Sequence, residues 1–136
     1  NLAEITILAQ KAGVPRQAFL DFMNNSVMGS VFTRYKTNAF INLDWTTTFT
    51  PALLRKDLDL GLAAGRELNV PMPVTATTRE ALQAHFGAAS LKNDPAAYLE
   101  EDFAAILETV ALGAGIQLES ENTPYPTGLE VPEAAE

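Results

Sequence analysis

Apolar residues recur every three to four positions along most of the chain, which is the spacing of amphipathic helices. The first such run extends from Leu2 to Ala12, and Gly13 is placed to end that helix. A second short helix is predicted to begin at Pro15. Its expected buried stripe consists of four apolar residues, Ala18, Phe19, Phe22 and Met23.

The middle of the chain contains the clearest helix signal. Residues 26–48 indicate a short helix followed by an irregular loop. Thr50 and Pro51 then mark a helix start, because the threonine can cap the free amides and proline suits the first helical position. The predicted helix continues to Leu68, where a segment with two prolines, residues 69–73, ends it.

Two further helices complete the prediction. One runs from Val74 to about Phe86 and ends at Gly87. The last begins at Pro95 and continues to a glycine-rich stop at residues 113–115. Since no set of alternating strands occurs, we predict an all-α fold of roughly six helices.

Composition divides the chain into two parts, a helical domain over residues 1–116 and a tail over residues 117–136. The tail holds three prolines and five glutamates, with no lysine or arginine. It therefore carries −5 of the net charge of −8, which leaves −3 for the helical domain.

One segment of the helical domain is positive. Between Val27 and Lys56 a single acidic residue faces four basic ones, Arg34, Lys36, Arg55 and Lys56, which gives +3. We expect any anion-binding site to lie in this segment.

The composition also excludes several classes of function. A net charge of −8 argues against nucleic acid or an anionic membrane as the main partner. The absence of cysteine excludes thiolate metal sites and cysteine nucleophiles. The single histidine, His85, has no second ligand beside it, so we expect it to cap or pack and we predict no metal site. No apolar run approaches the roughly 20 residues of a membrane span, and we expect a cytoplasmic protein.

Gly61 and Gly65 lie one turn apart inside the predicted helix of residues 51–68. Each costs the helix about 1 kcal/mol relative to alanine. We therefore predict that another element approaches this face closely. The approaching element is either a neighbour in the domain core or a helix of another subunit.

The segment from Phe49 to Leu62 contains a phenylalanine, a short spacer and then Lys56-Asp57-Leu58. This order resembles the C-terminal helical domain of the β-hydroxyacid dehydrogenases, a family that includes 3-hydroxyisobutyrate dehydrogenase and relatives of 6-phosphogluconate dehydrogenase. The flanking segments, residues 3–14 and 68–73, are similar to the same domain. The resemblance covers about residues 1–112.

The resemblance implies an all-α bundle like the C-terminal domain of 6-phosphogluconate dehydrogenase, in a homodimeric enzyme that uses NAD or NADP and a small hydroxyacid. Lys56 would hold the cofactor or the substrate carboxylate at the nicotinamide end of the cleft. Phe49 would pack near the nicotinamide, and Asp57 would orient nearby groups around the substrate. The alternative is a solvated lysine paired with Asp57 or Asp59.

Two elements of the family do not occur in this sequence. The dinucleotide-binding domain is one, and the other is the catalytic lysine in a Gly-x-x-x-Lys-x-x-Asn element. Because the chain opens on Asn1 without a methionine, we expect it to be a piece of a longer protein, with no catalytic residue and no activity of its own. The alternative function is a non-catalytic helical module for dimerisation or interaction.

Overall fold

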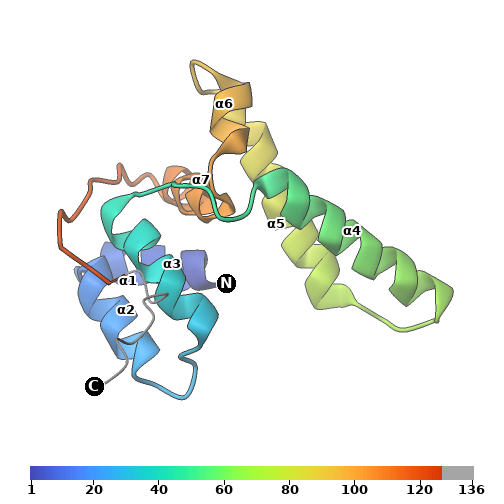
Figure 1. The fold of residues 1–136 in the computed structure, drawn as a ribbon, viewed down its shortest axis with the longest axis horizontal. Coiled ribbons are helices and arrows are strands. Elements are labelled where there is room, and N and C mark those ends of the chain that lie inside the picture. The colour runs from blue at the N-terminus through green and yellow to red at the C-terminus, as the bar shows by residue number, and fades with distance from the viewer. Residues whose placement is uncertain (127–136) are drawn as a thin grey trace, which may run out of the picture. The chain divides into compact units, whose positions relative to one another are not determined.

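The computed structural model describes residues 1–126, and every regular element in that part of the chain is a helix, so the all-α prediction is confirmed. No described helix has the length and apolar character needed to cross a membrane. The elements, labelled in Figure 1, are α1 (Leu2–Lys11), α2 (Arg16–Asn24), α3 (Val31–Asn42), α4 (Pro51–Glu67), α5 (Pro73–Ala89), α6 (Pro95–Glu100), the 3₁₀ helix η1 (Phe103–Ala105) and α7 (Ile106–Gly113).

The chain forms two compact units. Of the described residues, unit 1 consists of 1–44 together with 110–126, and unit 2 consists of 45–109. The boundary between the two units therefore falls inside α7.

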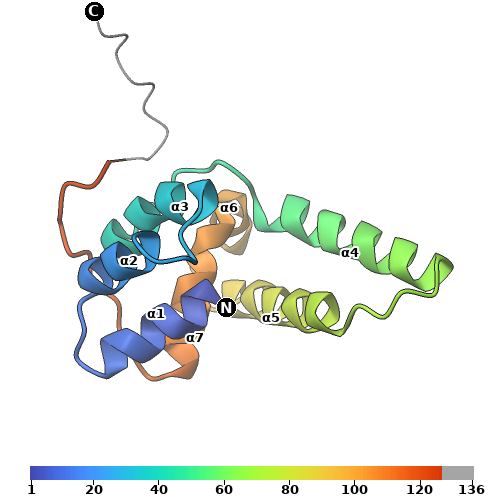
Figure 2. The ribbon, with the colours of Figure 1, turned by 90° about the horizontal axis from the view of Figure 1, so that it is seen from below.

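Unit 1 contains α1, α2 and α3, and α2 contacts both of the other helices (Figure 2). The face that α2 buries carries Arg16, Leu20 and Asn24, spaced four residues apart. The predicted stripe is wrong, because Ala18 and Phe22 are exposed and its other two members are only partly buried. The buried face is instead the one that carries Arg16, because the side chain of this arginine has hydrogen-bond acceptors in the interior of unit 1.

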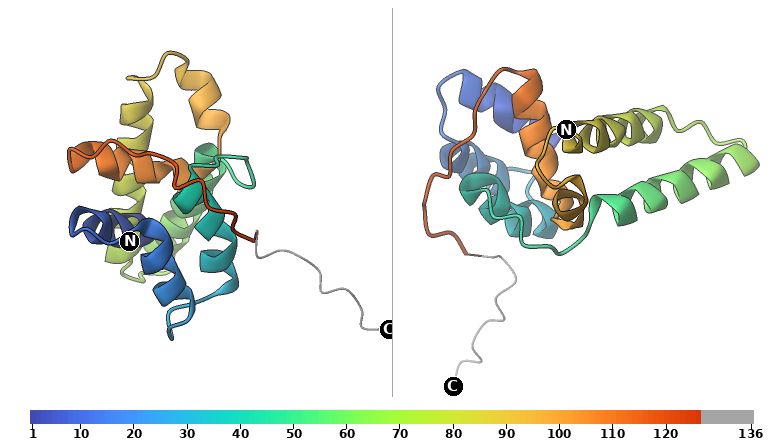
Figure 3. Two further views of the ribbon diagram at one scale, coloured as in Figure 1. Left: turned by 90° about the vertical axis from the view of Figure 1, so that its left-hand side faces the viewer. Right: turned by 90° about the horizontal axis from the view of Figure 1, so that it is seen from above.

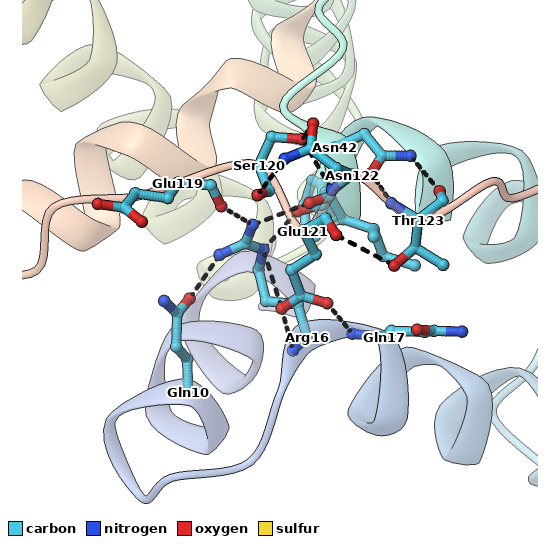
Figure 4. A network of polar contacts seen from close by, with 11 residues as sticks. Gln10, Arg16, Gln17, Asn42, Glu119, Ser120, Glu121, Asn122 and Thr123 are labelled. Atoms are coloured by element: carbon cyan, nitrogen blue, oxygen red, sulfur yellow. Dashed lines mark hydrogen bonds and ion pairs between the residues drawn. The ribbon is translucent and has the colours of Figure 1, made fainter.

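The Arg16 side chain is 1% exposed and lies at the centre of a polar network (Figure 4). Its Nε donates to the carbonyl of Phe40 at 2.6 Å, and its Nη2 donates to the carbonyl of Ile41 at 2.8 Å. Nη2 also donates to the carbonyl of Glu119 at 2.6 Å, and Nη1 donates to the Gln10 side chain at 3.0 Å. These bonds compensate the cost of burying a charge.

The segment that supplies Glu119 also caps α2. Pro15 precedes the helix and offers no side-chain oxygen to its free amides. The Glu121 carboxylate takes that place, accepting hydrogen bonds from the backbone N–H groups of Arg16 at 2.7 Å and Gln17 at 3.0 Å. Burial lowers the pKa of the Arg16 guanidinium, and the Glu121 charge opposes that shift. A residue more than 100 positions away in sequence thus completes the helix start.

Residues 117–126, which we call the C-terminal strap, make further hydrogen bonds within unit 1 and are drawn in red in Figure 3. The side chain of Asn42 exchanges two hydrogen bonds with the backbone of Thr123, at 2.7 and 3.0 Å. The Tyr125 hydroxyl donates to Asp21 at 2.8 Å. The remainder of the predicted tail, residues 127–136, lies outside the described residues.

Unit 2 begins with two long helices, α4 and α5, which run side by side in opposite directions (Figure 1). α4 starts as predicted, with Pro51 in its first turn and the Thr50 hydroxyl accepting a hydrogen bond from the N–H of Leu53 at 3.3 Å. The predicted end of α5 at Gly87 is wrong. The helix continues to Ala89, which is fully buried, and packing of this residue outweighs the modest helix penalty of one glycine.

The two glycines of α4 differ in their surroundings. A methyl group added at Gly65 would lie 2.6 Å from the sulfur of Met72 and 3.2 Å from the carbonyl oxygen of Val70. The same group at Gly61 would meet nothing within 4 Å. The predicted close approach is therefore confirmed at Gly65, where the turn after α4 folds back, and wrong at Gly61.

The predicted single helix from Pro95 is wrong, because the chain turns between α6 and α7 (Figure 3). Glu101 and Asp102 both have extended backbone, and the 3₁₀ helix η1 starts directly after them. The break lets Tyr98 of α6 enter a small core. This core comprises Ala89, Tyr98 and Ala105, with Trp45 and Leu99 packed against it.

Candidate functional site

The candidate site lies at the start of α4, and a short loop before that helix positions it. The carbonyl of Trp45, at one end of the loop, accepts a hydrogen bond from the N–H of Asp102 at 3.0 Å. The carbonyl of Phe49, at the other end, accepts a hydrogen bond from the N–H of Phe103 at 3.0 Å. The loop of residues 45–49 is therefore tied at both ends to the break between α6 and η1.

Phe49 is held by its side chain as well as by its backbone. Its ring meets the ring of Phe103 edge to face, with centroids 6.2 Å apart and planes at 90°. Such a pair adds roughly 1 kcal/mol beyond the area it buries. The Phe49 residue is nevertheless only half-buried.

Lys56 lies on α4, a little more than a turn after its start, and its side chain is 60% exposed. Its ammonium group is 3.0 Å from the carboxylate of Asp57, which is itself 51% exposed. An ion pair between two such exposed side chains contributes little stability. An anionic ligand could therefore displace Asp57 from the ammonium at small cost.

The neighbouring charges of α4 have other partners. Asp59, the second carboxylate that the sequence offered to Lys56, is 2.7 Å from Nε of Arg79 on α5. The guanidinium of Arg55 lies over the ring of Phe86, 4.1 Å from its centroid. Both interactions connect α4 to α5, and they leave Lys56 and Asp57 paired with each other.

The positive segment predicted from the sequence is divided between the two units. Arg55 and Lys56 belong to unit 2, whereas Arg34 and Lys36 belong to unit 1. Lys36 is buried, and its ammonium lies 4.9 Å from the centroid of the Tyr35 ring. In unit 2, Lys56 is thus the accessible ammonium of this segment.

A second cluster of polar residues surrounds Glu108, which lies far from Lys56 along the sequence. Its carboxylate accepts hydrogen bonds from Trp45 Nε1 at 3.1 Å, the Tyr98 hydroxyl at 2.9 Å and the Lys92 ammonium at 2.5 Å. Burial alone would raise the pKa of Glu108, but these three donors outweigh it and lower the pKa. Burial raises the pKa of the adjacent Glu101, and the charge of Glu108 adds to that shift.

His85 is fully buried beside this cluster. Its Nδ1 lies 2.8 Å from the Thr109 hydroxyl, and its ring packs against Tyr98 with centroids 5.1 Å apart. Burial lowers the pKa of His85. The expectation that this histidine packs is confirmed. Within residues 1–126, no group of histidine, aspartate and glutamate side chains is arranged to hold a metal ion.

Comparison with known proteins identifies the family. Residues 1–109 match the family model described as "NAD-binding of NADP-dependent 3-hydroxyisobutyrate dehydrogenase". The chain belongs to the 3-hydroxyisobutyrate dehydrogenase family. The resemblance carried by Lys56-Asp57-Leu58 is thereby confirmed at the level of the family, which is one of NAD-binding oxidoreductases.

Two relatives of the chain bear different names. The 3-sulfolactaldehyde reductase of Escherichia coli (strain K12) is 29% identical over 115 residues, 84% of this chain and 36% of the reductase. The cytokine-like nuclear factor N-PAC of Homo sapiens is 31% identical over 80 residues, 59% of this chain and 14% of that protein. The chain thus spans well under half the length of either relative.

Sequence reasoning missed one residue that helps to position this candidate site. Asp102 is 1% exposed, and one of its oxygens accepts a hydrogen bond from the N–H of Phe49 at 3.2 Å. Its other oxygen accepts a hydrogen bond from the N–H of Ala104 at 2.9 Å, as a helix cap does. That capping position, an aspartate directly before a helical turn, is the signal that could have found it.

Proposed function

We propose that the chain is the substrate-binding and dimerisation domain of an NAD(P)-dependent oxidoreductase that acts on the CH–OH group of a small hydroxyacid. The observation that carries this proposal is the family match over residues 1–109. The exposed ammonium of Lys56, on the helix that begins directly after Phe49, supports it. The cofactor supplies hydride transfer, and a dinucleotide-binding domain outside this chain binds most of it.

The residues at the start of α4 fit an anionic ligand with an aromatic end. Lys56 offers a flexible ammonium whose partner is an exposed carboxylate, so it anchors a carboxylate or phosphate. Phe49 is a half-buried residue whose ring is fixed against Phe103, and it would pack beside the nicotinamide. Asp57 pairs with the Lys56 ammonium when no ligand is bound. When the ligand is bound, Asp57 helps to orient the ammonium. The group that moves the proton lies outside this chain, which is therefore inactive alone.

We also propose that the domain forms a homodimer. The hairpin of α4 and α5 exposes large apolar side chains, and soluble monomers seldom leave extended apolar surface uncovered. The exposed residues of the hairpin are Leu53, Leu60, Leu68, Val70 and Val74. Sedimentation velocity should show a dimer that dissociates on dilution, and a monomer at every concentration would contradict the proposal. Because the net charge is −8, we expect neither a nucleic acid nor a membrane as a partner. We also expect the protein to be cytoplasmic.

The role of Lys56 is tested by Lys56→Ala in the full-length protein. Loss of a charged anchor should weaken cofactor or substrate binding by about tenfold or more. Arg66→Ala is the matched control, because it removes one exposed positive charge from the other end of the same helix. Binding of NADH and NADPH is measured through nucleotide fluorescence, and substrate KM through turnover. If the two variants behave alike, Lys56 is a solvated surface lysine.

One observation favours a second candidate function, a non-catalytic dimerisation or interaction module. The relative N-PAC carries the name of a nuclear factor and not of an enzyme. The coding sequence upstream of Asn1 separates the two candidates. A dinucleotide-binding domain with a Gly-x-x-x-Lys-x-x-Asn element supports the enzyme, and its absence supports the interaction module.

A further inference from the structure

Asp102 is an almost fully buried carboxylate that is shared between two segments of unit 2. Its Oδ2 accepts hydrogen bonds from three groups of the loop before α4, namely the Thr48 N–H at 2.9 Å, the Thr48 hydroxyl at 2.8 Å and the Phe49 N–H at 3.2 Å. Its Oδ1 accepts a hydrogen bond from the Ala104 N–H at 2.9 Å. One side chain thus caps η1 and fixes the loop at the same time.

The chemistry of the site requires a carboxylate. Both oxygens of Asp102 face hydrogen-bond donors, and an ionised carboxylate is the side chain that only accepts. An asparagine has one acceptor oxygen, so its NH₂ group would face either the loop donors or the Ala104 N–H. Asp102→Asn therefore keeps the shape of the side chain and breaks one half of the arrangement.

Phe49 is held both by Asp102 and by the residue that follows Asp102. The backbone of Phe49 donates to Asp102, and its carbonyl accepts from the N–H of the next residue, Phe103. Its ring packs edge to face on the Phe103 ring. Thr50, the cap of α4, directly follows Phe49, so the position of Phe49 also sets where the helix that carries Lys56 begins.

We propose that Asp102 is a positioning residue for cofactor binding, which acts by holding Phe49 and the start of α4 in the geometry that the nicotinamide requires. This proposal rests on the proposed function. The side chain of Asp102 is buried, and it acts through Phe49 and the start of α4. Displacements of about 1 Å at a binding group are enough to change binding and rates by large factors.

The experiment compares variants of the full-length protein by their dissociation constants for NADH and NADPH, measured through nucleotide fluorescence. Asp102→Asn should weaken binding about tenfold. Thr48→Val removes one of the loop donors from an exposed residue of nearly the same shape, and it should weaken binding by about two- to threefold.

Asp94→Asn is the matched control. Asp94 also caps a helix of unit 2, accepting a hydrogen bond from the N–H of Ala97 at 3.0 Å, but it is exposed and caps the start of α6, at the opposite end of that helix from Asp102. Urea denaturation of each variant gives its stability, and binding is measured where all are folded. A residue that merely stabilises the fold would leave the dissociation constant unchanged, as we expect for Asp94→Asn.

The outcomes separate this inference from the proposed function. Weaker binding in Asp102→Asn and Thr48→Val, with Asp94→Asn unchanged, supports the positioning role. If Lys56→Ala weakens binding while the Asp102 and Thr48 variants bind like the unmodified protein, the positioning role is overturned and the proposed function stands. If Lys56→Ala also binds normally, the positioning role is overturned and Lys56 is a solvated surface lysine. Should Asp102→Asn not fold, Thr48→Val decides, and unchanged binding overturns the inference.

Discussion

The first prediction concerns a single side chain of the C-terminal strap, that of Glu121. We consider the substitution Glu121→Gln, which keeps the length and shape of the residue. In the structure each carboxylate oxygen accepts one hydrogen bond, from the N–H of Arg16 and from the N–H of Gln17. Glutamine has a single acceptor oxygen, so its NH₂ group would face the second N–H. The substitution also removes the charge that lies 4.0 Å from the buried Arg16 guanidinium.

The expected loss follows from these contacts. A hydrogen bond to a charged group contributes about 1.5–3 kcal/mol, and a negative charge at a helix N-terminus adds about 0.5–1 kcal/mol. Because the Glu121 side chain is 22% exposed, solvent screens part of both effects. Glu121→Gln should therefore lower the free energy of unfolding by about 2 kcal/mol.

The assay is urea denaturation followed by far-ultraviolet circular dichroism. Glu119→Gln is the matched control, since it removes the same charge from the same strap. Glu119 binds Arg16 through its backbone carbonyl, and its residue is exposed, so the expected change is below about 0.5 kcal/mol. Equal unfolding free energies for the two variants would refute the capping role of Glu121.

Two further predictions concern unit 2. Gly61→Ala should raise the unfolding free energy by about 0.5–1 kcal/mol, whereas Gly65→Ala, which crowds Met72, should give none of that gain in the same urea assay. Glu101→Gln should raise stability near neutral pH, because burial and then the charge of Glu108 raise the pKa of Glu101 and disfavour its ionised form in the fold. The gain should vanish below about pH 4, where Glu101 is protonated in both states. A gain independent of pH would contradict this explanation.

Local signals predicted α4 almost to the residue. Thr50 supplies the cap and Pro51 the first turn, and the prolines after the helix stop it, so neighbouring residues alone decide where it begins and ends. Helix ends that depend on distant packing were predicted less well. α5 passes through Gly87 because Ala89 belongs to a core that residues far along the chain complete.

The buried face of α2 could not be predicted from its own residues. Hydrophobic periodicity favours the face with Phe22, but the structure buries Arg16 and Asn24. The reason lies elsewhere in the chain, in the carbonyls of Phe40, Ile41 and Glu119 that accept the guanidinium hydrogen bonds. A buried arginine becomes acceptable only when such acceptors are present, and no local pattern records them.

The candidate site shows the same division between local and distant information. Lys56 and Asp57 were proposed because they stand in a short local motif that resembles the family's, and their role in binding stays a prediction. Asp102 was missed because it lies inside an apolar run that reads as one helix, and its partners Thr48 and Phe49 lie more than 50 positions earlier. The carboxylate that interrupts that run caps η1 directly after the break and also binds the backbone of Phe49, so it connects the unexpected turn after α6 with the position of Phe49. If Asp102→Asn leaves Phe49 in place, this link between the break and the site is wrong.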